Sequence, residues 1–274
     1  MPIDEIAKHY TERHALRRGI FGSKPYSNYG YWSRPGMTID EACDAMAELV
    51  ARAGGFAAGQ RVLEVGCGYG ASAVQYAPLT GVAEVVGIDA TPVRVEEARA
   101  YVKSAGLEHQ IHIDVGDAIH TGFAAASFDH VLAMECAFHF DSRRSFFAEA
   151  FRVLRPNGVL TVTDIIVSPE ASKAGSPLPE LRRLLGADQK KILDTNIYDA
   201  DRFSEYLRDT GFVDVAVRSI KTEVVPAFAD HLERVALSTD PDRREPRLAA
   251  ARAFRTDFMY GADYVLVTAR KPNA

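Results

Sequence analysis

Residues 61–74 read RVLEVGCGYGASAV and place three glycines, Gly66, Gly68 and Gly70, at alternate positions between an apolar run and a helical pattern. Glycine lets a ligand approach the backbone closely and adopts the positive φ angles of tight loops. Gly66, Gly68 and Ala71 match G-x-G-x-x-G/A, a pattern typical of a nucleotide bound at a helix N-terminus. A single match of this kind is weak, so neighbouring residues must identify the nucleotide.

Carboxylates near this loop narrow the choice of ligand. Glu64 lies two positions before the first glycine, where its charge would repel a pyrophosphate but attract an ammonium or a sulfonium. Asp89 ends the run EVVGID, at roughly the ~20-residue spacing of an acidic residue that binds ribose hydroxyls. Asp117, with the amide of Ala118, follows the next run and could meet an adenine edge. A cationic head, a ribose and an adenine together describe S-adenosylmethionine.

A second group of chemically capable side chains lies in MECAFHF, residues 134–140. Glu135 and His139 are four positions apart, so a helical turn would point both side chains the same way. A neutral imidazole can accept a proton at physiological pH, although a histidine between two phenylalanines is, by itself, also typical of a structural residue. Asp164 lies inside the apolar run TVTDII, where a buried carboxylate needs a partner.

The elements that would position these residues follow from hydrophobic patterning. Apolar runs alternate with helical patterns, which is the signature of a parallel sheet with crossover helices. We expect a helix over 39–54 that ends at two glycines, and then strands at 61–65, 84–89, 111–116, 128–135, 158–167, 212–220 and 262–270. The intervening helices are expected at 71–79, 91–106, 142–154 and 199–211, with a long helical stretch at 226–258 broken near 238–241.

Local residues explain several of these boundaries. Thr91 precedes Pro92, so we expect the threonine hydroxyl to cap a helix that begins at the proline. Residues 155–158, RPNG, are expected to form a turn between helix and strand. Residues 168–198 are rich in Pro, Ser and Gly and then helical, which indicates a cap inserted at the ligand end of the sheet, together with the stretch 226–258.

Composition limits the partners. The chain has 274 residues and a net charge of -5 without a basic block, which argues against nucleic acid and favours a small molecule. Three scattered cysteines form neither a disulfide framework nor a zinc site, and no metal is implied. The N-terminus is polar and no apolar run approaches the ~18 residues of a membrane span, so we expect a cytoplasmic protein. A homo-oligomer is compatible with this sequence.

Four motifs carry a family resemblance. LEVGCGYG, GID, GDA and FRVLRPNG, within residues 61–167, resemble the ordered motifs of Rossmann-like S-adenosylmethionine-dependent methyltransferases. NYGYW, residues 28–32, is similar to the segment that small-molecule methyltransferases of the rebeccamycin sugar, tocopherol and sterol type lay over the methionine end of the cofactor. The resemblance implies an α/β fold with a seven-stranded, mostly parallel sheet whose last strand is antiparallel. It also implies an N-terminal helical lid, residues 1–55, and a methyltransferase domain, residues 56–274.

The resemblance further implies which residues bind S-adenosylmethionine. The glycine loop would lie beneath the methionine part, with acidic residues at the cation and ribose, a carboxylate and amide at the adenine, and a tyrosine in the covering segment. One departure is visible, because Asn157 stands where the family usually has glycine, and it affects only a turn. The implied cofactor residues are Tyr29, Glu64, Gly66, Gly68, Gly70, Asp89, Ala90, Asp117, Ala118 and Glu135.

The same resemblance implies two chemistries. His139 matches the general base of sugar O-methyltransferases and Asp164 matches its partner aspartate. In sterol and tocopherol C-methyltransferases, a residue like Glu135 could instead stabilise a carbocation while the histidine accepts a proton. The sequence leaves oxygen and carbon nearly balanced.

The acceptor and two other functions also stay open. Aromatic and aliphatic residues of the expected cap favour a lipophilic acceptor of specialised metabolism. A methyltransferase-like cyclase of a polyketide or terpenoid remains an alternative, since fold does not fix function. A dinucleotide-dependent oxidoreductase is disfavoured by Glu64 and by the missing third strict glycine. The residues that indicate a lipophilic acceptor are Phe140, Phe228, Leu232, Phe254 and Phe258.

Overall fold

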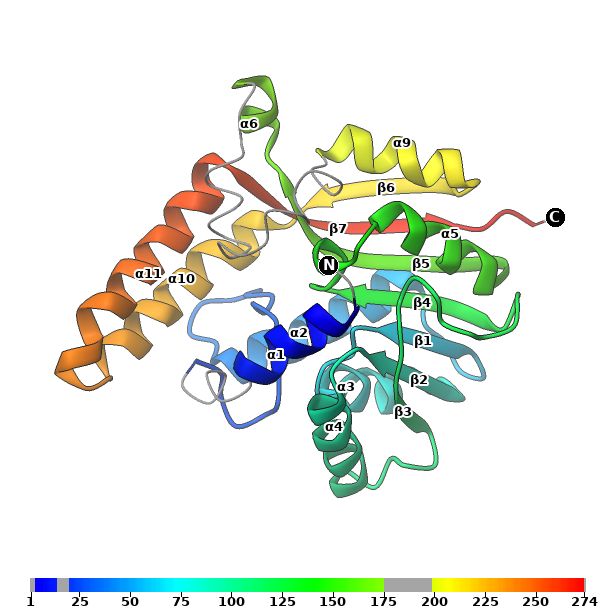
Figure 1. Ribbon diagram of the computed structural model, residues 1–274, viewed down its shortest axis with the longest axis horizontal. Coiled ribbons are helices and arrows are strands. Elements are labelled where there is room, and N and C mark those ends of the chain that lie inside the picture. Colours follow the sequence, from blue (N-terminus) through cyan, green and yellow to red (C-terminus); the bar gives the residue numbers. More distant parts are fainter. Residues whose placement is uncertain (1–2, 14–19, 175–198, 274) are drawn as a thin grey trace.

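The computed structural model describes residues 3–13, 20–174 and 199–273, which form a layered α/β structure (Figure 1). A seven-stranded sheet runs in the order β3-β2-β1-β4-β5-β7-β6, with β7 antiparallel to both of its neighbours and the other pairs parallel. This confirms the predicted Rossmann-like fold. The strands are β1 (Arg61–Val65), β2 (Glu84–Asp89), β3 (Ile111–Val115), β4 (Phe128–Met134), β5 (Leu154–Val167), β6 (Val213–Ser219) and β7 (Ala262–Arg270).

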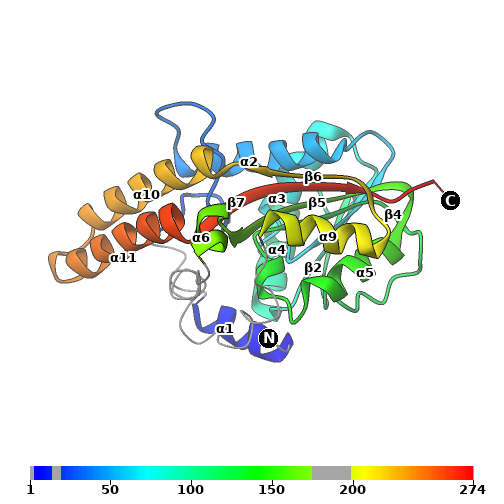
Figure 2. The ribbon, with the colours of Figure 1, turned by 90° about the horizontal axis from the view of Figure 1, so that it is seen from above.

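Helices cover both faces of the sheet. On one face α2 (Ile39–Gly54), α3 (Ala71–Thr80) and α4 (Pro92–Ser104) enclose a core that includes Met46 and Tyr76. On the other face α5 (Arg143–Val153) and α9 (Ala200–Thr210) bury a phenylalanine-rich core. Figure 2 shows α2 on the opposite side of the sheet from α5 and α9. Both faces are therefore buried, as a parallel sheet requires.

Helix ends follow the local sequence with one exception. Thr38 and Glu41 form a capping box at the start of α2, and Gly55 ends that helix in the left-handed conformation. Pro92 begins α4 as expected, but the Thr91 hydroxyl makes no capping hydrogen bond. The Thr91 amide instead donates to Asp89 Oδ1 at 2.8 Å, because that carboxylate already turns toward the start of the helix.

The expected turn at 155–158 is part of β5, which begins at Leu154. The pairing with β4 jumps from Phe128 opposite Leu154 to His130 opposite Val159, so the RPNG residues form an irregularity inside the strand. Asn157 has a φ of 64°, which asparagine tolerates better than most residues. The sequence thus identified the bend but not the continuation of strand pairing through it.

Three of the described segments lie outside the sheet layers: the helical pair between β6 and β7, the short helix after β5, and the N-terminal helix. The helices α10 (Lys221–Leu237) and α11 (Pro241–Tyr260) connect β6 to β7 and extend from the carboxyl edge of the parallel strands (Figure 1). α6 (Pro169–Ala174) begins the other expected cap, whose remaining residues 175–198 lie outside the described part of the chain. α1 (Ile3–Arg13) lies on the opposite side of the molecule from α2 in Figure 2.

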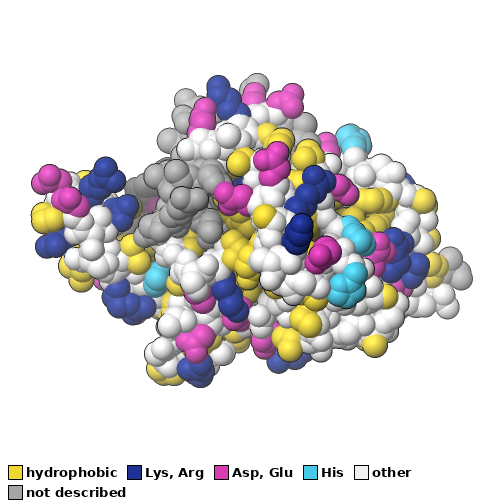
Figure 3. Space-filling model, turned by 90° about the horizontal axis from the view of Figure 1, so that it is seen from below, with side chains coloured by type: hydrophobic (Ala, Val, Ile, Leu, Met, Phe, Trp, Pro, Cys, Tyr) yellow, Lys and Arg dark blue, Asp and Glu magenta, His cyan; other side chains and the backbone are white. Residues whose placement is uncertain are grey.

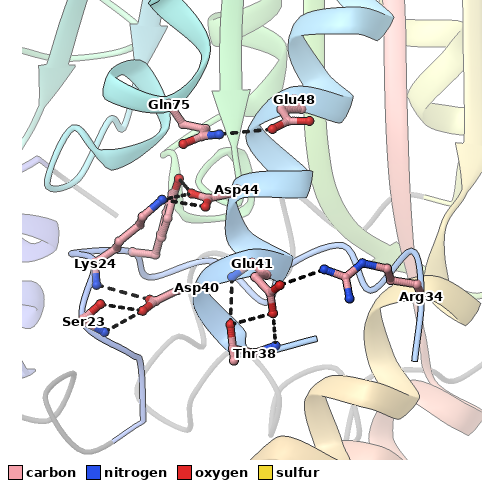
Figure 4. A network of polar contacts seen from close by, with 10 residues as sticks. Ser23, Lys24, Arg34, Thr38, Asp40, Glu41, Asp44, Glu48 and Gln75 are labelled. Atoms are coloured by element: carbon pink, nitrogen blue, oxygen red, sulfur yellow. Dashed lines mark hydrogen bonds and ion pairs between the residues drawn. The ribbon is translucent and has the colours of Figure 1, made fainter. Parts of the chain in front are cut away.

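Residues 20–38, which we call the collar, are fastened to α2 (Figure 4). The Ser23 amide and hydroxyl donate to Asp40 Oδ2 at 2.8 and 2.7 Å, and Lys24 Nζ bonds Asp44 at 2.6 Å. A Cβ at Gly22 would lie 2.4 Å from the Asp40 carboxylate, so this glycine serves close packing. The collar is thereby held against the body of the molecule.

Candidate active site at the carboxyl edge of the sheet

A cavity opens at the carboxyl ends of β1, β2 and β4, where open parallel sheets bind ligands. Strand register brings this edge together, because Val65 pairs with both Ile88 and Ala133. Among the described residues, the lining includes nine of the predicted site residues: Glu64, Gly66, Gly68, Asp89, Ala90, Asp117, Ala118, Glu135 and His139. Tyr29, Gly70 and Asp164 are placed around it rather than in its lining.

The glycine loop has the geometry that the sequence indicated. Gly66, Gly68 and Gly70 have φ angles of 63°, 56° and 73°, which strongly favour glycine. A Cβ at Gly66 would lie 2.7 Å from Cys136, whereas a Cβ at Gly68 would make only an ordinary contact, at 3.7 Å from Ser27 Oγ. Gly66 and Gly68 line the cavity without side chains, while Gly70 is the N-cap residue of α3.

Asp89 at the end of β2 is tied to the glycine loop. Its Oδ2 accepts the Gly68 amide at 3.0 Å, and its Oδ1 accepts the Thr91 amide at 2.8 Å. These bonds fix the carboxylate at the cavity wall. Asp117 also lines the cavity and accepts the Ile119 amide at 3.0 Å, which closes a turn. Both carboxylates thus combine a structural bond with exposure to the ligand space.

Glu64 lies beneath the loop and is almost completely buried. It accepts hydrogen bonds from the Ser72 hydroxyl and, at 2.9 Å, from the Tyr76 hydroxyl, both on α3. Burial raises the pKa of Glu64 to about 7, and the two hydroxyl donors oppose that rise. A cation in the cavity would therefore favour the ionised form of a carboxyl that is close to its titration midpoint.

Glu135 follows β4 with a φ of 50°, an unusual value for a non-glycine residue. Its Oε1 accepts the Tyr29 amide at 2.8 Å and the Tyr264 hydroxyl. Burial raises the pKa of Glu135 to about 8, the two donors oppose the rise, and Asp164 adds to it. The collar, β4 and β7 thus meet at one carboxyl group.

Tyr29 reaches the site through its backbone. Its ring stacks on Phe228 of α10 at 4.7 Å and lies edge-on to Phe254 of α11 at 5.2 Å. Phe228 and Phe258 are buried in this aromatic cluster and are not among the residues that line the cavity. Of the aromatic residues expected to indicate a lipophilic acceptor, Phe140 is the one that lines the cavity.

His139 lies in a short 3₁₀ turn, Ala137–His139, between β4 and α5. Its Nε2 is 2.5 Å from the hydroxyl of Tyr10, which α1 inserts into the cavity. The Arg94 guanidinium lies 3.9 Å from the centroid of the Tyr10 ring. Burial raises the pKa of Tyr10 although Arg94 opposes this, so the phenol is neutral and carries a proton.

Asp164 is fully buried in β5 behind this turn. Arg143, the first residue of α5, donates from Nε to Asp164 Oδ2 at 2.8 Å, and the Ile165 amide donates to Oδ1 at 2.9 Å. Burial raises the pKa of Asp164, and Arg143 is the strongest opposing influence. The carboxylate that the sequence indicated as a partner for His139 therefore has a buried cationic partner.

Comparison with known proteins identifies the chain. Residues 63–162 match the family model described as "Methyltransferase domain". The chain is 32% identical over 259 residues to an erythromycin 3''-O-methyltransferase of Saccharopolyspora erythraea, covering 91% of this chain and 84% of that protein. The chain belongs to the small-molecule S-adenosylmethionine-dependent methyltransferases. The methyltransferase is also 29% identical to a 27-O-demethylrifamycin SV methyltransferase of Amycolatopsis mediterranei, over 98% of both chains.

A solved structure agrees over nearly the whole length. The [4+2]-cyclase SpnF superimposes on the methyltransferase with a TM-score of 0.80 and 26% identity, covering 99% of this chain and 97% of that one. The predicted class of enzyme and the predicted cofactor are confirmed. The same comparison keeps a cyclase among the functions that this fold supports.

The residues of the cavity fit S-adenosylmethionine. Gly68 lines the cavity without a side chain, Asp89 and Asp117 provide acceptors, and two carboxyl groups with raised pKa can answer a cationic group. Within the described ranges, no cluster of His, Cys, Asp and Glu has the geometry of a metal site. No described helix is both long and apolar enough to cross a membrane.

Sequence reasoning missed several residues of this site. Ser72 and Tyr76 carried a usable signal, since they are four positions apart at the start of the helix that follows the glycine loop. Tyr10, Arg143 and Tyr264 carried none, because their partners are distant in sequence or their types are common on surfaces.

Proposed function

We propose that the methyltransferase methylates a hydroxyl oxygen of a small lipophilic acceptor, with His139 as the general base. A hydroxyl group bonded to His139 Nε2 inside the cavity, that of Tyr10 at 2.5 Å, is the observation that supports this role. An acceptor hydroxyl in the same position would donate its proton to the imidazole. The relatives named for O-methylation of antibiotics support an oxygen acceptor of specialised metabolism.

Residue roles follow from the cavity wall. S-adenosylmethionine supplies the methyl group. Gly66 and Gly68 would hold its methionine part, Asp89 with Ala90 its ribose, and Asp117 with Ala118 its adenine. Glu64 and Glu135 would provide negative charge near the cationic groups of the cofactor, since each carboxyl group loses its proton more readily beside a positive charge. Tyr29 and Gly70 would act by supporting Glu135 and α3.

Residues 1–55 are proposed as the lid segment of the domain that spans residues 56–274, and α1 would be the part of this segment that moves. α1 supports this proposal, because its Tyr10 lies in the cavity between Arg94 and His139. An acceptor hydroxyl and the Tyr10 hydroxyl compete for Nε2, so α1 must move during each turnover. Gly30 packs the collar closely against α2, since a Cβ there would lie 2.7 Å from that of Ala42. The moving part is therefore α1, and the collar stays in place.

An acceptor screen tests the proposed function. We expect the purified protein and S-adenosylmethionine to form S-adenosylhomocysteine with a hydroxylated macrolide or ansamycin, with 27-O-demethylrifamycin SV as one probe. The His139→Ala variant, which we expect to transfer methyl at least a hundredfold more slowly, is the matched control for enzyme-dependent turnover. Products methylated on carbon, with Glu135→Gln slower than His139→Ala, would contradict the oxygen acceptor.

A cyclase is the second candidate function, supported by the likeness to the [4+2]-cyclase SpnF. In that case the cofactor would be bound without being consumed. Mass spectrometry separates the two functions, because methylation adds one methyl group and cyclisation leaves the mass of the acceptor unchanged. Formation of S-adenosylhomocysteine in step with product would exclude the cyclase.

We also propose a cytoplasmic location and a homo-oligomer. Cys43, Cys67 and Cys136 are buried and unpaired with one another as disulfides, which fits a reducing compartment. Acidic and basic side chains are interspersed on the face seen in Figure 3, rather than gathered in a field of one sign that would steer a highly charged partner. Light scattering after gel filtration would test the oligomeric state.

A further inference from the structure

We propose that Arg143 is a positioning residue for methyl transfer. With Asp164 it forms a buried ionic clamp that holds the turn carrying Glu135 and His139 at the cavity. Asp164 would then serve the turn as the anion of this clamp rather than as a proton partner of the histidine. The inference rests on the proposed role of His139, but it concerns a residue that lies outside the cavity lining.

Arg143 and Asp164 form a buried, hydrogen-bonded ion pair. The side chains of Arg143 and Asp164 are 1% and 0% exposed, so this ion pair is buried, unlike the exposed pairs elsewhere on the surface. Arg143 uses two different nitrogens: Nε donates to Asp164 Oδ2 at 2.8 Å and Nη2 donates to the Ile165 carbonyl at 2.8 Å. The guanidinium also lies 6.0 Å from the ring centroid of Phe203. A planar arginine fork suits this double engagement better than a lysine would.

The charges of Arg143 and Asp164 depend on each other, because both side chains are buried. An arginine side chain stays protonated in proteins, so loss of the carboxylate charge would leave a buried cation without its counter-charge. The Ile165 amide and the Phe138 amide also donate to Asp164 and favour its ionised form. Burial raises the pKa of Asp164, and Arg143 with these two amides opposes that rise, so the contacts around Asp164 are those of a carboxylate paired with a guanidinium.

Hydrogen bonds join the turn that carries Glu135 and His139 to strand β5. The Glu135 amide donates to the Thr163 carbonyl at 2.9 Å, one residue before Asp164. The Phe138 amide donates to Asp164 itself, next to His139 in sequence. At the other end, Ser142 caps α5 and Arg143 returns to Asp164. The eight residues 135–142 are thus attached to β5 at both ends and in the middle.

The turn contains a residue with a strained backbone conformation, which the clamp can hold in place. Glu135 has a φ of 50°, a conformation that costs free energy in a residue with a Cβ. Such a conformation persists only where surrounding contacts fix it. Arg143 and Asp164 are buried and are not among the residues that line the cavity, so they can provide that constraint without occupying space needed by cofactor or acceptor.

Hydrogen–deuterium exchange of the full chain saturated with S-adenosylhomocysteine tests the clamp without an acceptor. We expect Arg143→Met and Asp164→Asn each to raise the exchange rate of residues 135–142 at least fivefold, while the affinity for S-adenosylhomocysteine stays within threefold. The double variant should exchange no faster than the faster single variant, because both changes remove one interaction. Arg143→Lys should restore part of the protection.

Arg144→Met is the matched control, since Arg144 is the next residue of α5, is exposed and lies over Tyr206. It should exchange like the parent. Unchanged exchange in Arg143→Met, rates that multiply in the double variant, or faster exchange spread over the whole sheet would each overturn the clamp. If Arg143→Met does not fold, the comparison of Arg143→Lys with Asp164→Asn decides by the same readout. The outcome for His139→Ala is independent, so failure of the proposed base and failure of the clamp can be told apart.

Discussion

The two halves of the active site are built from different kinds of contact. At the carboxyl ends of β1 and β2, the defining bonds are local: Gly68 and Asp89 are 21 residues apart, and Glu64 and Ser72 are 8 apart. At the end of β4, the Tyr29 amide and Glu135 are 106 residues apart, and Tyr10 and His139 are 129 apart. The cofactor half depends on one βαβ unit, whereas the transfer half depends on segments from the whole chain.

This difference has a functional consequence. A cofactor shared by many enzymes can be recognised by a backbone loop and a few acidic residues, whose geometry is set within one unit of the fold. An acceptor differs between enzymes, so its half of the site is completed by segments that can vary: the N-terminal helix, the collar and the helices between β6 and β7. The two halves should therefore respond independently to mutation.

The largest change in the rate of methyl transfer is expected for His139, which lies in the transfer half of the site. We expect His139→Ala to slow single-turnover methyl transfer at least a hundredfold, because loss of a general base typically costs a factor of about 10²–10⁴. Its affinity for S-adenosylmethionine, measured by calorimetry, should stay within threefold of the parent. His112→Ala is the control, since that histidine is half-exposed on β3. Near-parental transfer by His139→Ala would remove the histidine from the mechanism.

Asp89→Ala should weaken cofactor binding while changing the rate of methyl transfer much less. The change removes a ribose acceptor and the bond to the Gly68 amide, so we expect S-adenosylmethionine to bind at least tenfold more weakly, or about 1.4 kcal/mol. Single-turnover transfer at saturating cofactor should fall much less than in His139→Ala. Asp114→Ala on the neighbouring strand, where the carboxylate is exposed and pairs with Arg99, is the control. An unchanged dissociation constant would show that Asp89 has only a structural role.

The same division sets how much the sequence could predict. The sheet, its strand limits and the cofactor half were predictable because strand patterns and the glycine loop are read from neighbouring residues. The clamp of Arg143 on Asp164 was not, since an arginine pair before an apolar helix is usually a solvated face. The strand irregularity at Asn157 and the position of Tyr10 also depend on tertiary contacts. Site residues that lie within short motifs could be predicted from the sequence, whereas the residues that hold them in place from distant segments could not.

The pH dependence of stability tests the two halves separately, because each half contains one glutamate whose pKa is raised by burial. Burial raises the pKa of Glu64 to about 7 and the pKa of Glu135 to about 8 in the folded protein, against an ordinary value of 4.5. Folding therefore favours their protonated forms. The stability that they contribute is complete below about pH 4.5 and is lost as pH rises through about 7 and 8.

We expect the free energy of unfolding of the cofactor-free protein to fall by roughly 6 kcal/mol between pH 5 and 8, about 2.5 from Glu64 and about 3.5 from Glu135, since each unit of pKa shift is worth about 1.4 kcal/mol. Glu64→Gln and Glu135→Gln should each remove part of this slope in urea titrations. Saturation with S-adenosylmethionine should flatten the slope in the parent, because the ligand favours the ionised carboxylates. A slope that neither variant changes would mean that these groups do not titrate in this range.

The smallest expected effect concerns Tyr10, the residue that touches both halves. Its hydroxyl bonds His139 and its ring lies under Arg94, so Tyr10→Phe removes the first contact and keeps the second. One hydrogen bond contributes about 1 kcal/mol, so we expect at most a tenfold change in methyl transfer and no change in cofactor affinity. Tyr10→Ala removes both contacts, and we expect it to weaken cofactor binding as well, because α1 then loses its attachment to Arg94 beside Asp89. Calorimetry and single-turnover kinetics on the two variants separate these effects. If Tyr10→Phe weakened cofactor binding as much as Tyr10→Ala, the hydroxyl rather than the ring would join α1 to the cofactor half, and the two halves would not be independent at this residue.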